Sequence, residues 1–136
     1  MRTKKHMTLG FYQNLGKLFY AIAAADHVVN PKEFETLKEL VKKQWLEVDD
    51  INDTFGTDAA YQIEIVFDWL NTHETDLSIE QYFNDFVNYK NEQKHLFTDT
   101  VNKLIIKTAS AIAASFSGIN KSELILLAKL DMELKK

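Results

Sequence analysis

The turn at residues 25–33 holds the side chains best placed to do chemistry. Asp26 and Glu33 stand near its two ends, and His27 lies beside Asp26. A tight turn can bring two carboxylates together. Such oxygen ligands suit Mg²⁺ or Ca²⁺, whereas an added imidazole favours Zn²⁺ or Mn²⁺. A later turn of similar sequence carries a further carboxylate, Glu123. Asp26, His27, Glu33 and Glu123 are therefore a candidate site for a divalent cation.

Helix capping explains the same turn without a metal ion. Asn30 is a good N-cap residue, Pro31 follows at the first helical position, and Glu33 stands three residues after the cap. A glutamate there can accept a hydrogen bond from the backbone of the cap residue. In the later turn, Phe116 takes the place of Asp26, so a site built from both turns would be incomplete. Capping is the favoured role, and the cation site is the alternative.

Other catalytic and metal-binding patterns are missing from the sequence. It has no cysteine, no glycine-rich phosphate loop, no Gly-x-Ser-x-Gly elbow and no His-Glu-x-x-His pair. The acidic segment at 49–58 does not fit a calcium loop. With Asp50 in first place, Gly56 falls at position 7 and Tyr61 stands where a glutamate is required. We therefore expect a solvated loop there and a protein that is not an enzyme.

Length and composition indicate one globular domain. The chain has 136 residues, 46% of them hydrophobic and 26% charged, which is close to the average of folded domains. No apolar stretch is long enough to span a membrane, and no secretion signal is recognisable. We therefore expect a single domain over residues 1–136 in the cytoplasm.

Charge is distributed unevenly along the sequence. Residues 44–89 contain 11 Asp and Glu, whereas all 16 Lys and Arg lie outside this segment. An acidic surface repels nucleic acid and attracts cations or basic proteins. We therefore expect a protein partner and no nucleic acid. The alternative is that the acidic helices lie against basic helices of the same fold.

Hydrophobic spacing predicts an all-α fold, a compact bundle of about six or seven helices. Apolar residues recur at intervals of three and four. The expected helices lie at 8–25, 30–48, 58–70, 78–91, 98–116 and 120–134. In the third helix, Ile65 and Trp69 are expected to face the core, and in the last helix Leu124. Residues 108–116 carry no charge, which predicts that this part of the fifth helix is the buried centre of the bundle.

The two ends of the chain resemble one another. A shift of 90 residues places residues 15–40 on residues 105–130 with 9 identities in 26 positions and no gap. We interpret this as two copies of a helical hairpin, at about 8–48 and 98–135, with the acidic helices of 49–91 between them. Small residues at 23–24 and 113–114 would let the two copies approach closely.

The first turn is similar to the signature of the TerB-like family, which is linked to tellurite resistance. In that family one helix ends in Ala-Asp-Gly, a short turn carries Val or Ile, and a Glu opens the next helix. The glycine of that pattern is His27 here, and the second hairpin keeps Ile119 and Glu123. The positions that match in the first hairpin are Ala25, Asp26, Val29 and Glu33.

The resemblance implies an all-α fold of about seven helices and a non-enzymatic role in bacterial stress response. It implies action through protein contacts, with a cation bound at the acidic turn. A similar turn occurs near the start of some membrane-bound J-domain co-chaperones, which leaves a membrane-associated partner open. The sequence also leaves open whether the protein forms a homo-oligomer. The alternative function is a stress protein that binds a divalent cation through Asp26 and Glu33.

Overall fold

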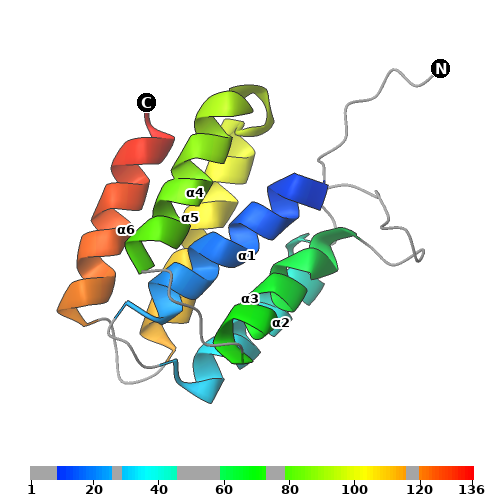
Figure 1. Ribbon diagram of the computed structural model, residues 1–136, viewed down its shortest axis with the longest axis vertical. Coiled ribbons are helices and arrows are strands. Elements are labelled where there is room, and N and C mark those ends of the chain that lie inside the picture. Colours follow the sequence, from blue (N-terminus) through cyan, green and yellow to red (C-terminus); the bar gives the residue numbers. More distant parts are fainter. Residues whose placement is uncertain (1–8, 26–28, 46–58, 73–78, 116–119) are drawn as a thin grey trace.

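The computed structural model describes residues 9–25, 29–45, 59–72, 79–115 and 120–136 (Figure 1). These residues contain helices and no strand, so the predicted all-α bundle is confirmed. None of the described helices is long and apolar enough to cross a bilayer. The α-helices are α1 (Leu9–Ala23), α2 (Pro31–Lys43), α3 (Gln62–Thr72), α4 (Ile79–Glu92), α5 (Asp99–Ala114) and α6 (Lys121–Leu134), and two 3₁₀ turns are η2 (Ala59–Tyr61) and η3 (Lys94–Leu96).

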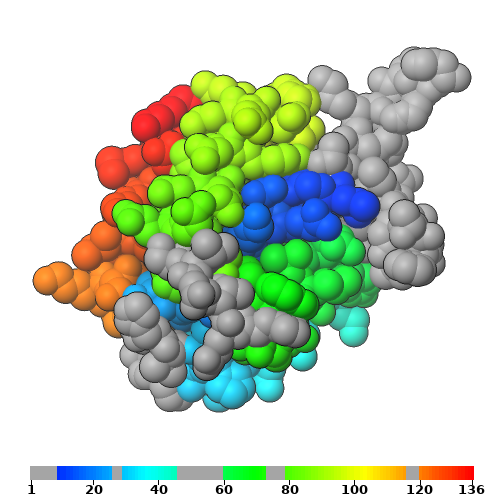
Figure 2. All heavy atoms as spheres, in the orientation of Figure 1, coloured from blue at the N-terminus to red at the C-terminus, as the bar shows by residue number. Residues whose placement is uncertain are grey.

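The helix α1 forms the centre of the bundle and contacts α3, α4, α5 and α6 (Figure 1). Its apolar residues occupy more of the circumference than one stripe, so neighbours on several sides can bury them, and Gln13, Asn14 and Lys17 lie on the remaining side. Its amino-terminal part is visible at the surface in Figure 2, between α4 and α3. The buried residues of α1 are Phe11, Tyr12, Leu15, Gly16, Leu18, Phe19, Ala21, Ile22 and Ala23.

The prediction that the charge-free part of α5 is the central helix was therefore wrong. Ala109, Ile112 and Ala113 are buried there, but Ala114 is exposed and Ser110 is half-buried. Alanine and serine present little apolar area, so an uncharged face made of them tolerates water. The absence of charge in α5 reflects small residues and not burial on all sides.

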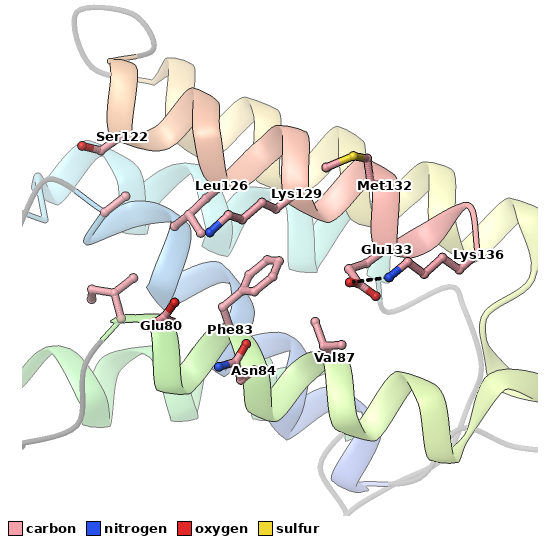
Figure 3. A pocket seen from close by; sticks show the side chains of 12 residues that line it. Glu80, Phe83, Asn84, Val87, Ser122, Leu126, Lys129, Met132, Glu133 and Lys136 are labelled. Carbon is pink, nitrogen blue, oxygen red and sulfur yellow. Dashed lines mark hydrogen bonds and ion pairs between the residues drawn. The ribbon is translucent and has the colours of Figure 1, made fainter.

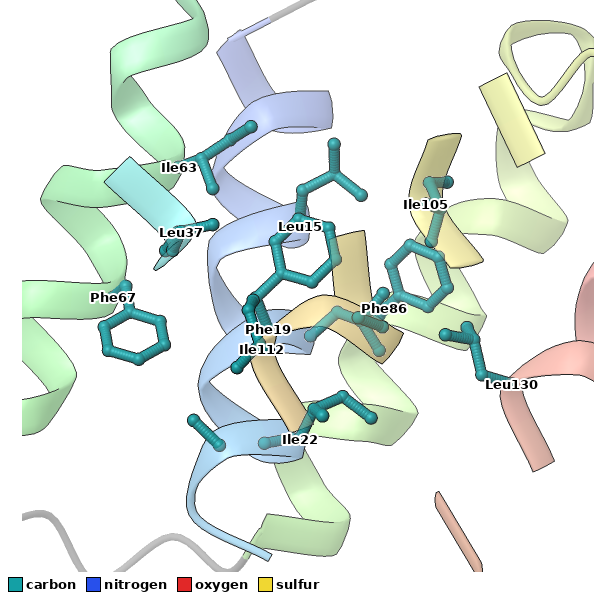
Figure 4. Close-up of a cluster of buried hydrophobic side chains, with 14 of the residues drawn as sticks. Leu15, Phe19, Ile22, Leu37, Ile63, Phe67, Phe86, Ile105, Ile112 and Leu130 are labelled. Carbon is teal, nitrogen blue, oxygen red and sulfur yellow. The ribbon is translucent and has the colours of Figure 1, made fainter. Parts of the chain in front are cut away.

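Side chains from all six α-helices meet around α1 in one hydrophobic cluster (Figure 4). Aromatic contacts join the elements. Tyr20 of α1 meets Phe67 of α3 and Tyr82 of α4 edge to face, each at a centroid distance of 5.7 Å. Phe34 of α2 stacks on Phe67 at 5.1 Å. Each aromatic pair contributes about 0.5–1.5 kcal/mol beyond the apolar area it buries.

Two buried polar contacts fix the helices at their ends. The indole Nε1–H of Trp45, just after α2, donates to the hydroxyl of Thr108 on α5 at 3.0 Å. Lys90 of α4 is 3% exposed, and its ammonium donates to the backbone carbonyl of Glu133 on α6 at 2.7 Å. The carboxylate of Glu133 lies 3.8 Å from the same ammonium. Both contacts satisfy polar groups that would otherwise be costly to bury.

The two proposed hairpins differ in how they pack. α6 packs against α5 and α1, whereas α2 packs against α5 and α3. Of the small residues expected to face one another, Ala23, Ala24 and Ala113 are buried, but Ala114 is exposed. The internal repeat therefore remains a prediction.

A glycine sets the distance between α1 and α3. A Cβ atom at Gly16 would lie 2.8 Å from Cβ of Val66 and 2.9 Å from the carbonyl oxygen of Ile63. Both distances are shorter than van der Waals contact. The backbones of the two helices can approach this closely only because position 16 has no side chain.

We expect Gly16→Ala to destabilise the fold, although alanine is the better helix former. Overpacking costs about 1–3 kcal/mol, which exceeds the gain of about 1 kcal/mol in helix propensity. Urea denaturation followed by circular dichroism measures the change. Addition of Val66→Ala should restore only a small part of the loss, because it removes the Cγ1 atom at 3.1 Å but keeps Cβ of residue 66 and the carbonyl oxygen of Ile63. If Gly16→Ala alone were as stable as the wild type, the close approach of the α1 and α3 backbones at position 16 would be contradicted.

Candidate interaction site

The two candidate glutamates both serve as helix caps. The backbone N–H of Asn30 donates to the carboxylate of Glu33 at 2.7 Å, and the N–H of Asn120 donates to Glu123 at 3.1 Å. In return, the side chain of each asparagine accepts a hydrogen bond from the first turn of its helix. Glu33 is 4% exposed and Glu123 is 2% exposed. The capping boxes expected from the sequence are therefore present at both helices.

The cation site of the sequence analysis remains a prediction. Asp26 and His27 lie outside the described residues, as do Phe116 and the acidic segment at 49–58. Within the described ranges, no three His, Asp or Glu side chains form a group that could hold a metal ion. One carboxylate oxygen of Glu33 and one of Glu123 accept a hydrogen bond from the cap backbone, so a cation would have to share these groups.

The exposed face of α3 was not anticipated. Ile65 and Trp69 were predicted to face the core, but each has 52% of its surface exposed. This prediction was wrong, because a different side of α3 faces the core. Ile63 and Phe67 face the core in their place, together with Leu70, which was expected there and is buried. Tyr61 and Val66 are partly buried against the core.

The sequence contains a signal that could have revealed this face. Ile63, Phe67 and Leu70 recur at spacings of four and three, and so form a complete apolar stripe. Ile65 and Trp69 form a second pair four residues apart on the same helix. A helix that covers a core on one side needs only one stripe, so the surplus pair indicates a second apolar face.

One acidic residue, Asp68, lies beside the exposed apolar pair. Asp68 is exposed next to Trp69, and α3 lies within the segment 44–89 that contains no Lys or Arg. Ile65, Asp68 and Trp69 are spaced by three and four residues, and therefore share one side of the helix. We call these three residues the α3 face. It can offer apolar area and negative charge to another molecule.

Glu64 lies at the margin of the α3 face where α3 meets α2, near Lys38 and Lys42. Burial raises the pKa of Glu64 above its ordinary value, although the two lysines act in the opposite direction. The carboxylate of Glu64 is thus not part of the exposed acidic face. It belongs to the contact between α2 and α3, where ionisation has a cost.

Comparisons of the chain with protein-family models, with curated proteins and with solved structures give no match. The TerB-like resemblance therefore remains a prediction from the sequence.

We expect Glu64→Gln to stabilise the protein at pH 7. The folded pKa of Glu64 is raised, so its contribution to stability is fully present below the ordinary pKa and is lost as the pH rises through the folded pKa. The variant should gain over the wild type near pH 7, and the gain should vanish below pH of about 4. Urea denaturation at both pH values measures it, with Glu35→Gln on the exposed side of α2 as the control. If Glu64→Gln were stabilised over the wild type by the same amount at both pH values, the cost of ionising Glu64 would not be the cause.

The cation hypothesis predicts that EDTA-treated protein gains thermal stability with one of Ca²⁺, Mg²⁺, Mn²⁺ or Zn²⁺. A ligand at 100 times its dissociation constant stabilises by about 2.7 kcal/mol, a shift of several degrees for a domain of this size. Asp26→Asn should abolish the shift. Glu123→Ala should lower stability by about 0.5–2 kcal/mol with or without the ion, because it removes half of a capping box. The absence of a shift with all four ions would reject the cation site.

Proposed function

We propose that this chain is a non-enzymatic interaction module of the TerB-like kind, which acts in stress response through protein contacts at an acidic surface. The link of that family to tellurite resistance is part of the proposal. The observation that carries it is the α3 face, where Ile65 and Trp69 are half-exposed beside Asp68.

Tryptophan on a protein surface supports a role in binding. Large aromatic residues dominate the energy of protein interfaces because they bury much area with few rotatable bonds. Exposure of an indole to water is unfavourable, and a partner that covers it gains that free energy. Trp45, the other tryptophan, is fully buried in the core, whereas Trp69 has 52% of its surface exposed.

The partner that fits the α3 face is basic and apolar. The segment 44–89 has 11 acidic residues and no basic one, so a cationic partner is attracted and an anionic one is repelled. The α3 face is one side of a helix, and a matching amphipathic helix can lie along it with apolar residues against Ile65 and Trp69.

We expect the protein to bind an amphipathic Leu/Lys helical peptide and not its Leu/Glu counterpart. The fluorescence of Trp69 should shift to shorter wavelength as the indole leaves water. The double variant Ile65→Ser/Trp69→Ser should weaken binding by roughly 30-fold, since loss of one interface anchor costs about 2 kcal/mol. For that variant, which lacks the fluorescent reporter, calorimetry measures the affinity.

The matched control is Leu124→Ser on α6. Leu124 is 58% exposed, so its replacement removes similar apolar area far from α3. This control should bind the Leu/Lys peptide with the affinity of the wild type. The proposed function would be contradicted if the α3 double variant bound the Leu/Lys peptide as tightly as the wild type does. It would also be contradicted if the wild type bound the Leu/Glu peptide as tightly as the Leu/Lys peptide.

A further inference from the structure

A groove lies between α4 and α6, on the opposite side of α1 from α3 (Figure 3). Its volume is about 540 Å³. Phe83 on α4 and Leu126 on α6 extend into it, and Val87 and Met132 line it further. At one end the contact between Lys90 and Glu133 holds the two helices together. The groove therefore has an apolar lining on two helices that are fixed to one another.

The groove is lined by charges of both signs: Glu80 of α4 and Glu133 of α6 are acidic, and Lys129 and Lys136 are basic. Lys129 is exposed and extends toward the space between the helices (Figure 3). Within the described part of the chain it has no ionic partner. Lys135 and Lys136 form ion pairs with Asp131 and Glu133 on the same helix, at 3.0 Å and 3.1 Å. Lys129 is thus the cation that an incoming acidic group can pair with.

The α3 face has the complementary properties. Ile65 and Trp69 supply apolar side chains four residues apart. Asp68 between them is a carboxylate without a cationic partner in the described ranges. Pockets that bind drug-sized ligands measure roughly 300–1,000 Å³. The groove is therefore large enough to receive the indole of Trp69.

The α3 face and the groove cannot meet within one molecule. α6 lies along one side of the bundle and α3 along the other, with α1 between them (Figures 1 and 2). Contact between them requires two copies. An interface between two different surfaces of the same protein is heterologous, and it builds rings or open chains.

We propose that the chain assembles head to tail, with the α3 face of one copy seated in the α4–α6 groove of the next. Trp69 inserts between Phe83 and Leu126, and Asp68 pairs with Lys129. The inference rests on the proposed function, because both use the α3 face, and it names a second copy of this chain as a partner. An interface of one helix face and one groove is small, so association is weak and salt-dependent.

Sedimentation velocity on the full chain tests the assembly with two variants that each block one surface. Ile65→Ser/Trp69→Ser removes the α3 face, and Lys129→Glu/Met132→Glu places acidic groups at the groove. All four positions are exposed in the folded chain, so both variants should fold, which circular dichroism checks. The wild type and the Leu124→Ser control should both gain mass with concentration. Each blocked variant alone should remain a monomer.

An equimolar mixture of the two blocked variants decides the geometry. Each variant keeps the surface that the other lacks, so the mixture should form a 1:1 heterodimer and nothing larger. A charge exchange, Asp68→Lys with Lys129→Glu in one chain, should restore the assembly that each single exchange weakens. A mixture that stays monomeric while the wild type assembles would overturn the head-to-tail contact.

The same proteins separate failure of this inference from failure of the proposed function. A wild type that is monomeric at all concentrations, but binds the Leu/Lys peptide through Ile65 and Trp69, overturns self-assembly and keeps the binding role. Assembly that depends on both surfaces, without peptide binding at the α3 face, supports self-assembly and counts against the proposed basic partner. Assembly that survives in both blocked variants overturns the inference.

Discussion

Burial of α1 on several sides is the constraint on which the other helices depend. One helix contacts α3, α4, α5 and α6, so each of these needs only one apolar stripe to complete the core. This arrangement concentrates the apolar residues in the middle of a small domain, where the area removed from water is the main stabilising contribution. The sides of the outer helices that do not face the core can therefore hold charged residues or exposed apolar residues.

The α3 helix illustrates this division between core and surface. Ile63 and Phe67 hold it against the core, and the missing side chain at Gly16 allows its backbone to approach that of α1. A helix held in this way presents Ile65 and Trp69 on a rigid support. Binding through such a face costs little conformational entropy, because the residues that touch a partner are already in place.

Local signals in the sequence were sufficient for much of the fold. The capping boxes at Asn30 and Asn120 depend on residues within one helical turn, and both are present. Tertiary context decided the rest. α3 has more apolar residues than one stripe requires, so spacing alone could not assign Ile65 and Trp69 to the surface. Leu124 was expected to face the core by the same logic, and it is exposed because Glu123, as a cap, takes the buried position beside it.

The negative charge of residues 44–89 can be read from the sequence, whereas the exposed apolar pair of the α3 face was missed. The segment without basic residues indicated an acidic binding surface, but the apolar pair at its centre emerged from the packing of α3 against α1. The groove between α4 and α6 has no sequence signal, because it forms from residues about 45 positions apart whose helices are joined by one buried lysine.

The central position of α1 has a consequence for synthesis on the ribosome. α1 precedes the other described helices in the chain, yet α5 and α6, which cover part of it, come far later. At about 5–20 residues per second, the interval between α1 and α5 lasts on the order of 5–15 s. During that time an unusually apolar helix has only part of its final cover. Part of the apolar surface of α1 therefore stays uncovered until the carboxyl-terminal third of the chain has been synthesised.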